Sequence, residues 1–567
     1  EGDFAFLHDS TTVKLAADTA STDNDEATTG VLVDLLTLGA SNVNVFAGVP
    51  GVVALQLAGV QFGLALMSAQ SDSSRRWASI KANASSVALT GINGVSVSGS
   101  DLGFVYNSAL GGSDAVVDFN AQALAVGTGV GSSISLDTAG ARGELRQVFG
   151  TLSLDVAGFV QTTGSFAFER GTQALTLADG SVVQADVLSL GAQNASAYAG
   201  NAGGAGLNLT GVDLALALVS DSVDNARTWV SLEATAATAG LTGLSDLSLN
   251  ASNLHVAINQ AGTDGDAVLD TLVSPITVTT GSSTSMSLAL DGGQDELLQV
   301  SGAFELVVSD FFSLSGNMAL EQSNQAVVLT GDATATATRA LMLGGSNLSA
   351  FVGVNGSNSA RTGLSLEGVA FGLAVLTESG VVTPRQWVSL QASAQDAAFV
   401  GVNGLTLSAS RVSVDINRAA ADGSVVDYAA QGLSIATGPV SSLSLDMAGG
   451  AGQLLRVRAH VHADVFDFVQ FSGDVAIEKQ TTGLTLSDGS NVQADVLSIG
   501  LHDVRAFAGV SGGSADAMGL ELSGVDLALV MAGERVTSGT ARQWTSLQAS
   551  ATRAALVGVE GVSLSGQ

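Results

Sequence analysis

The chain has no cysteine among its 567 residues, which excludes disulfides, thiolate metal sites and cysteine nucleophiles together. A protein without disulfides has to gain its stability from length and packing. Only 4 residues are proline whereas 69 are glycine, a balance typical of long strands punctuated by turns. Charged residues make up 13%, about half the usual share for a globular protein.

Positive charge is the scarcest kind. The sequence holds 20 Lys and Arg against 52 Asp and Glu, a net charge of −32. Phosphate backbones and anionic lipids repel such a chain, so we expect neither nucleic-acid binding nor attachment to a membrane surface. The hydrophobic share of 46% excludes a disordered chain. We read the acidity as a coat that keeps an apolar protein soluble.

One stretch occurs four times and divides the chain into repeats. Each copy opens on Gly-Val and holds one of the four tryptophans, which lie 152, 158 and 157 residues apart. The predicted units are residues 1–150, 151–302, 303–458 and an incomplete 459–567. The predicted structural anchors are the tryptophans, expected in the core, and the glycines, expected to start strands: Trp77, Trp229, Trp387, Trp544, Gly59, Gly211, Gly368 and Gly524.

Alternation within each repeat predicts β-strands. Val212, Leu214 and Leu216 project to one side and Asp213 and Ala215 to the other, the period of a strand and not of a helix. Asp-Gly pairs between alternating runs predict hairpins, and therefore antiparallel sheets, at 179–180, 264–265, 422–423 and 488–489. Mid-strand glycines are expected at bends or bulges. A parallel β-solenoid is the alternative, because leucine pairs recur at irregular steps.

A transmembrane segment is not expected. Residues 46–69 carry no charge and are long enough to cross a bilayer, but their apolar residues alternate with period two. The equivalent segments of other copies hold Asp213, Glu521 and Asp526, which are costly inside a membrane. Glu1 opens within a repeat and without a leader, so we expect a piece of a longer chain.

Several side chains could carry chemistry. His460, His462 and Asp464 would share one face of a strand, a metal-like arrangement that is absent from the other copies, so we favour exposed histidines. Calcium is the one cofactor that acidic turns could bind, although Asx-turns explain them without a metal: Asp114, Asp118, Asp264, Asp266, Asp270, Asp422 and Asp427. An arginine before each tryptophan is expected to stack on the indole or pair with a carboxylate: Arg76, Arg227, Arg385 and Arg542.

No catalytic constellation recurs, so enzyme activity is not expected. The repeated pattern Gly-Val-Asp-Leu-Ala-Leu, Arg-Gln-Trp and Ser-Leu-Gln-Ala-Ser resembles the repeat regions of giant bacterial surface proteins, which are extracellular adhesins or filament formers. The resemblance implies an extracellular or cell-surface location. The chain differs from calcium-dependent repeats-in-toxin adhesins, because it lacks their Gly-Gly-x-Gly-x-Asp motif.

The resulting prediction is an all-β, elongated antiparallel array of about 155-residue units that forms a filament, stalk or surface coat. Its expected partner is itself, with possible cell-surface or glycan contacts and no resident cofactor. An adhesin that exposes its Trp–Arg pairs is the first alternative. A lipid-conducting groove lined by leucine faces is the second.

Overall fold

The computed structural model confirms an all-β chain, with 72% of residues in strands and 2% in helices. It describes residues 2–16, 25–49, 53–110, 115–201, 204–244, 246–263, 265–356, 360–536, 539–559 and 564–566. Two compact units are described separately below: unit 1 is residues 1–243 and 255–298, and unit 2 is residues 244–254 and 299–567. The boundaries of the four repeats remain a prediction.

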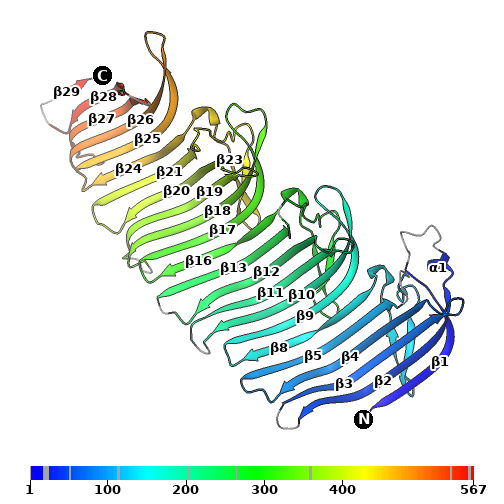
Figure 1. Ribbon diagram of the computed structural model, residues 1–567. Helices are drawn as coiled ribbons and strands as arrows, with labels where there is room; N and C mark the ends of the chain where they lie inside the picture. Colours follow the sequence, from blue (N-terminus) through cyan, green and yellow to red (C-terminus); the bar gives the residue numbers. More distant parts are fainter. Residues whose placement is uncertain are drawn as a thin grey trace. The chain divides into compact units, whose positions relative to one another are not determined.

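Strands follow one another along the chain with few other elements between them (Figure 1). Up to residue 298 they are β1 (Asp3–Val13), β2 (Val31–Val49), β3 (Val53–Ala69), β4 (Arg76–Thr90), β5 (Val95–Ala109), β6 (Leu124–Gly129), β7 (Ser132–Leu136), β8 (Leu145–Val156), β9 (Val160–Thr176), β10 (Val182–Gly200), β11 (Gly206–Asp221), β12 (Thr228–Thr242), β13 (Leu247–Ala261), β14 (Ile276–Thr279) and β15 (Ser285–Leu288). Short helices lie at α1 (Asp25–Thr28), η1 (Gly140–Arg142) and η2 (Gly292–Gln294).

The remaining strands complete unit 2. They are β16 (Leu297–Val308), β17 (Phe312–Val328), β18 (Ala335–Val354), β19 (Thr362–Glu378), β20 (Gln386–Val400), β21 (Leu405–Arg418), β22 (Leu433–Gly438), β23 (Ser441–Leu445), β24 (Leu454–Val465), β25 (Val469–Thr485), β26 (Asn491–Val510), β27 (Met518–Glu534), β28 (Gln543–Val557) and β29 (Leu564–Gly566), with the short helix η3 (Gly449–Ala451) before β24. Residues 46–69, which we did not expect to span a membrane, belong to β2 and β3. In the described part of the chain, no helix is long and apolar enough to cross a membrane.

Neighbouring strands pair antiparallel, as the Asp-Gly turns predict. At Asp179-Gly180, for example, Thr176 of β9 faces Val182 of β10, and the ladder continues to Val160 and Ala199. Every pairing among the described strands is antiparallel, so the solenoid alternative is wrong. Asp422-Gly423 does turn the chain, but the run after it forms no hairpin with β21. That run crosses towards β22 instead and lies beside the end of β17, where Val426 forms a bridge with Leu329.

Mid-strand glycines bend the long strands, also as predicted. Gly59, Gly211, Gly368 and Gly524 have φ of 60°, 58°, 60° and 59°, a region that residues with a Cβ rarely adopt. They lie inside β3, β11, β19 and β27, several residues after each strand begins. The expectation that they start strands is therefore wrong. The alternating pattern is interrupted at the bend, so only the stretch after it is visible in the sequence.

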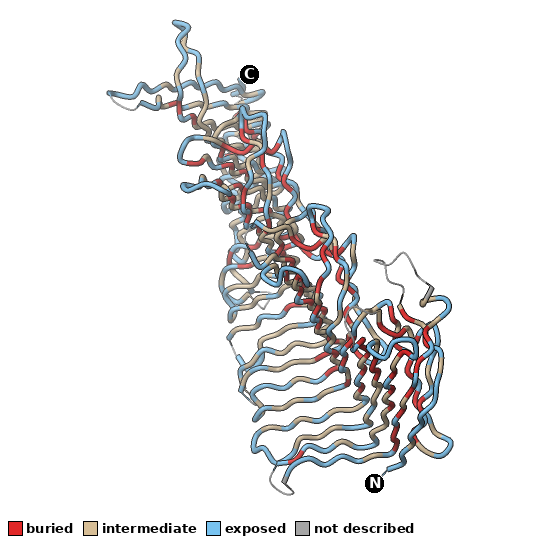
Figure 2. The backbone as a smooth tube through the Cα atoms, turned by 45° about the vertical axis from the view of Figure 1, so that its right-hand side comes forward, coloured by how far each residue is buried: buried red, intermediate tan, exposed pale blue. Residues whose placement is uncertain are grey.

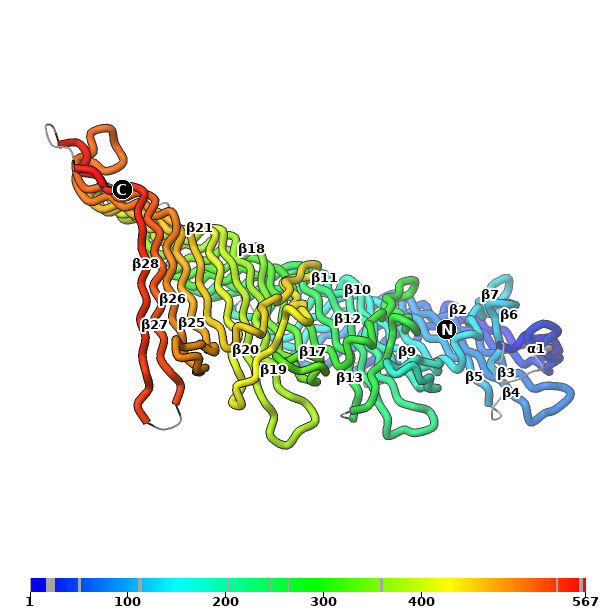
Figure 3. Tube along the Cα trace, turned by 90° about the horizontal axis from the view of Figure 1, so that it is seen from above, coloured from blue at the N-terminus to red at the C-terminus, as the bar shows by residue number. Residues whose placement is uncertain are grey.

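The sequence did not reveal three small hairpins that cover the sheet. They are β6–β7, β14–β15 and β22–β23. Each lies over one face of the long strands, as β6 does on β2 (Figure 3), and its inward side chains complete a core with that face. Buried positions accordingly gather in the part of each long strand nearest the hairpins (Figure 2). The opposite face carries no such layer among the described residues, and we call it the uncovered face.

Candidate functional site

Three of the predicted anchors lie at the centre of these cores. Trp77, Trp229 and Trp387 are 0%, 1% and 0% exposed. Each indole nitrogen donates a hydrogen bond to a backbone carbonyl in the segment before the hairpin, at 2.9 Å for Trp77 and Trp229 and 3.1 Å for Trp387. Trp544 is only half-buried. The buried tryptophans have no free ring face for a sugar, which removes the basis of the adhesin alternative in those three repeats.

An arginine stacks on each of the four indoles and also pairs with a carboxylate. The stacking pairs are Arg75–Trp77, Arg227–Trp229, Arg385–Trp387 and Arg542–Trp544, with the guanidinium 5.1 to 5.4 Å from the ring centre. In the first repeat the stacking residue is Arg75 and not Arg76, because the register places the arginine two residues before the tryptophan. The hydrogen bond from Arg542 lowers the pKa of Glu534 to about 2.

Three asparagines near the ends of β5, β13 and β21 have a structural role that the sequence did not reveal. Asn107, Asn259 and Asn417 are fully buried, and each amide donates to a backbone carbonyl of the segment before the hairpin at 2.7 to 2.9 Å. They recur at one position of the repeat, which is the signal that could have identified them. Together with the tryptophan they fix the path of that segment across the sheet.

The carboxylates of the acidic turns accept hydrogen bonds from backbone and hydroxyl groups of the protein itself. Asp422 accepts hydrogen bonds from the backbone nitrogen and the hydroxyl of Ser424 at 3.0 and 2.6 Å, and these bonds lower the pKa of Asp422. Asp179 and Asp488 make the same turn with the serine two residues on. Asp118 and Asp427 each accept from a backbone nitrogen at 2.9 Å. Asp114 and Asp264 lie outside the described residues.

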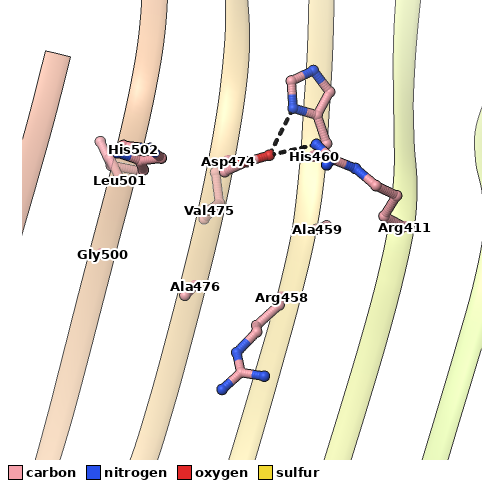
Figure 4. A pocket seen from close by; sticks show the side chains of 10 residues that line it. All are labelled: Arg411, Arg458, Ala459, His460, Asp474, Val475, Ala476, Gly500, Leu501 and His502. Carbon is pink, nitrogen blue, oxygen red and sulfur yellow. Dashed lines mark hydrogen bonds and ion pairs between the residues drawn. The ribbon is translucent and has the colours of Figure 1, made fainter. Parts of the chain in front are cut away.

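Of the predicted cluster, only His460 lines an open pocket of about 360 Å³ in unit 2, together with His502 (Figure 4), whereas His462 and Asp464 lie outside it. Asp474 accepts from His460 Nδ1 and from Arg411 Nη2, both at 2.8 Å, and His502 bonds Asp526 instead. The hydrogen bond from His460 is the main cause of the lowered pKa of Asp474. Among the described residues, no group of three or more His, Cys, Asp or Glu is placed to hold a metal ion.

The uncovered face carries an unbroken apolar row across each unit. In unit 1 directly opposed residues on nine strands from β2 to β12 form it: Ala40, Phe62, Ala82, Phe104, Val148, Phe168, Leu190, Leu216 and Leu232. In unit 2 the row runs over ten strands from β17 to β28: Met318, Gly345, Phe371, Ala392, Val414, Val457, Ile477, Ile499, Leu529 and Leu547. Neither row contains a charge or a hydrogen-bonding side chain.

Two arginines lie beside the row in unit 1. Arg146 of β8 and Arg170 of β9 face each other across the strand pair, one step from Val148 and Phe168. Like charges in that position repel. Arg146 stacks on Tyr106 at 5.8 Å, and Arg170 lies 3.4 Å from Asp186. A cavity of about 220 Å³ opens between them, lined also by the carboxylates of Glu144 and Asp186 and by Ser108 and Thr172.

No protein-family model and no curated protein matches the chain. Among solved structures, it matches the siderophore receptor PirA from Pseudomonas aeruginosa with 6% identity and a TM-score of 0.18, covering 97% of this chain and 80% of the receptor. It matches the copper transporter OprC with 10% identity and a TM-score of 0.19, over the same shares of the two chains. Scores this low carry no argument for a shared fold or activity.

The comparisons give no support to the predicted role. The matched structures are a receptor and a transporter, and neither is a filament, stalk or coat protein. The prediction of a self-assembling structural or adhesive protein is therefore withdrawn.

Proposed function

We propose that the uncovered face binds the hydrocarbon chains of amphiphilic molecules. The observation that carries this proposal is the unbroken apolar row, which crosses nine strands in unit 1 and ten in unit 2. At about 4.8 Å between strands, each row extends for roughly 40 Å. Phe168 and Val148 at its middle are 54% and 48% exposed. Contiguous apolar surfaces on this scale mark interaction sites.

The arginine pair suggests how an anionic amphiphile would be oriented. A carboxylate or phosphate between Arg146 and Arg170 would relieve the repulsion of the two guanidinium groups and accept their hydrogen bonds. Its hydrocarbon chain would then lie along Val148 and Phe168 in the neighbouring row. The rest of the acidic surface would repel the headgroup, so this pair is the preferred position for it in unit 1.

Binding of Nile red, a neutral dye that brightens in apolar surroundings, tests the row directly. The triple variant Val148→Thr, Phe168→Thr and Leu190→Thr keeps good strand formers on β8, β9 and β10. We expect it to bind the dye at least about tenfold more weakly, a loss of roughly 1.4 kcal/mol. Val223→Thr is the matched control, because Val223 is 89% exposed in a turn away from the row.

Oleic acid distinguishes the contribution of the arginine pair from that of the apolar row. It should displace Nile red from the wild-type protein, and Arg146→Gln with Arg170→Gln should weaken oleic acid while leaving Nile red binding unchanged. Equal dye binding by the triple variant and the Val223→Thr control would refute the proposal.

The position of the protein outside the cell rests on the resemblance of its repeats to bacterial surface proteins.

A further inference from the structure

A phenylalanine lies at the tip of the same turn in three repeats. Phe159, Phe311 and Phe468 follow β8, β16 and β24 and lie 152 and 157 residues apart. They are 54%, 61% and 56% exposed. The backbone carbonyl of each accepts a hydrogen bond of 2.9 Å from a glycine nitrogen of β10, β18 or β26, which holds the turn in place. The three turns therefore present their rings to the surroundings in the same way.

These turns lie along one edge of each unit, at the ends of the long strands away from the small hairpins (Figure 1). In unit 1 Val156 pairs with both Val95 and Val160, so the β4–β5 and β8–β9 turns are neighbours. In unit 2 Val465 likewise pairs with both Leu405 and Val469, at the β20–β21 and β24–β25 turns. We call this edge, which is a row of adjacent turns, the far edge.

Charge is scarce at the far edge. In unit 1 its connections β2–β3, β4–β5, β8–β9 and β10–β11 contain no charged residue. In unit 2 the connections β16–β17, β18–β19, β20–β21, β24–β25 and β26–β27 contain four: Asp310, Arg361, Asp467 and Asp516. At the opposite ends every connection between long strands carries at least one charge, as Asp179 does in β9–β10. The exposed rings thus project from the edge that is poorest in charge.

An apolar track joins the far edge to the apolar row on the uncovered face. Alternate residues of a strand share one face, so a track follows two paired strands from the row to a phenylalanine turn. In unit 2 it consists of opposed pairs on β24 and β25: Val457–Ile477, Ala459–Val475, Val461–Gly473, Ala463–Phe471 and Val465–Val469. In unit 1 it consists of pairs on β8 and β9: Val148–Phe168, Gly150–Phe166, Leu152–Gly164, Leu154–Thr162 and Val156–Val160. Thr162 is the only polar side chain in the two tracks.

The carboxylates nearest these turns are directed away from the track. Asp155 and Asp464 alternate with the track residues and so lie on the other face. They accept hydrogen bonds from the backbone nitrogens of Gly158 and Asp467, at 2.8 and 2.9 Å. Phe466 adds a second ring to the β24–β25 turn, 60% exposed and at a φ of 51°, which bulky residues rarely adopt. The turn geometry alone does not explain an exposed ring at that position.

We propose that the far edge of each unit docks onto a bilayer of neutral lipid, and that hydrocarbon chains pass from the bilayer along the track to the apolar row. The rings of Phe159, Phe311 and Phe468 would lie in the interfacial region, where protruding apolar groups are buried without a matching pocket. Transfer along the track rests on the proposed function of the row, whereas docking does not.

Three observations favour a neutral bilayer as the partner. The rings lie on separate turns, so a protein would need a pocket for each, whereas fluid lipid closes around all of them. The net charge of −32 repels anionic lipid but not zwitterionic lipid, so the expected lack of membrane attachment does not extend to a neutral surface. The tracks also give a continuous apolar path from such a surface to both rows.

Flotation of the full chain with phosphatidylcholine vesicles tests docking. The tip variant, Phe159→Thr with Phe311→Thr and Phe468→Thr, should bind these vesicles at least about tenfold more weakly than the wild type. Its matched control is Val223→Thr with Val273→Thr and Val382→Thr, because these valines are 89%, 65% and 102% exposed outside the far edge. The control should bind like the wild type, and vesicles of phosphatidylglycerol should bind more weakly than phosphatidylcholine.

Vesicles loaded with radiolabelled oleic acid test transfer. After the vesicles are removed, the tip variant should hold as much label as the wild type but acquire it at least about tenfold more slowly. The triple variant of the row, Val148→Thr with Phe168→Thr and Leu190→Thr, should bind vesicles normally and retain little label. Uptake at equal rates by the tip variant and its control would overturn transfer from the bilayer. Loss of Nile red binding in solution by the row variant, and not by the tip variant, keeps the two proposals distinct.

Two results would overturn docking. The first is equal flotation of the tip variant and its control, or no flotation of the wild type with phosphatidylcholine. The second is concentration-dependent dimers that sedimentation detects in the wild type and not in the tip variant, which would show that a second copy covers the far edge.

Discussion

The third and fourth repeats present the same tryptophan motif in two settings. Arg385 and Arg542 stack on Trp387 and Trp544 at 5.1 and 5.4 Å, and each donates to a glutamate at 2.7 Å, Glu378 or Glu534. Only Trp387 lies beneath a described hairpin, and only Trp387 is fully buried. The long strands are thus sufficient to assemble the Arg–Trp–Glu cluster, whereas burial of the indole requires the hairpin.

Removing the indole should give the largest difference between the two repeats. Trp387→Ala deletes a fully buried side chain and its hydrogen bond to Ser424, so we expect a loss of about 3–5 kcal/mol in local stability. Trp544→Ala deletes a half-buried side chain and should cost on the order of 1 kcal/mol. Hydrogen exchange of β19–β20 against β27–β28 measures both losses in one protein.

Exchange is the appropriate measurement because a repeat protein opens locally, so a single unfolding temperature would average the two regions. Trp229→Ala serves as a second buried case. Similar losses at Trp387 and Trp544 would mean that the hairpin contributes little to the tryptophan core.

A smaller difference is expected at Gly344 and Gly500, two glycines at the same position of the third and fourth repeats. Gly344→Val drives a side chain into the carbonyl of Ala436 and should cost about 1–3 kcal/mol through displacement of β22. Gly500→Val meets no atom within 4 Å and, as a strand former replacing glycine, should be neutral or slightly stabilising. Urea denaturation, monitored by hydrogen exchange of the same strands, compares the two variants. A costly Gly500→Val would contradict the open space above Gly500.

The smallest effect concerns the glutamates beneath the arginines. Because the hydrogen bond from Arg542 lowers the pKa of Glu534 from 4.5 to about 2, ionised Glu534 stabilises the fold above pH 4.5. That contribution should disappear as the pH falls from about 4.5 to about 2. The pKa of Glu378 is lowered in the same direction by Arg385.

The variants Glu534→Gln and Glu378→Gln measure these contributions. Hydrogen exchange of β27 in the first variant and of β19 in the second is compared with that of the wild type between pH 5 and pH 2. Salt should reduce the difference more at Glu534, because the side chain of Arg542 is 50% exposed and that of Arg385 is 30%. A pH-independent difference would show that the glutamates act by packing instead of charge.

Local pattern was enough to predict the strands, their antiparallel pairing and the bends. Alternation in Val212 to Leu218 and the turn at Asp179-Gly180 both act between neighbours in the sequence, which is why they were readable. The stacking of arginine on tryptophan was readable for the same reason, apart from the choice between Arg75 and Arg76. The starts of the Gly-Val strands were misplaced because Gly59 and its equivalents bend a strand that has already begun.

The hairpins and the arginine pair were not readable in this way. Residues 433–445 look like any other short alternating run, and nothing local says that they leave the main ladder and fold over β17–β19. Arg146 and Arg170 are 24 residues apart and become neighbours only through the register of β8 and β9. Similarly, Gly500 resembles Gly344 in sequence, and only the structure shows that a hairpin carbonyl lies over Gly344 whereas no described atom lies over Gly500.

The sequence by itself determined that this protein is an all-β chain of repeated antiparallel strands with recurrent tryptophans, because alternation and turn formation are local properties. Tertiary structure alone decided which face of those strands is covered. Both faces carry apolar side chains, and the choice depends on where three hairpins of non-local origin dock. That choice leaves the apolar rows available for binding.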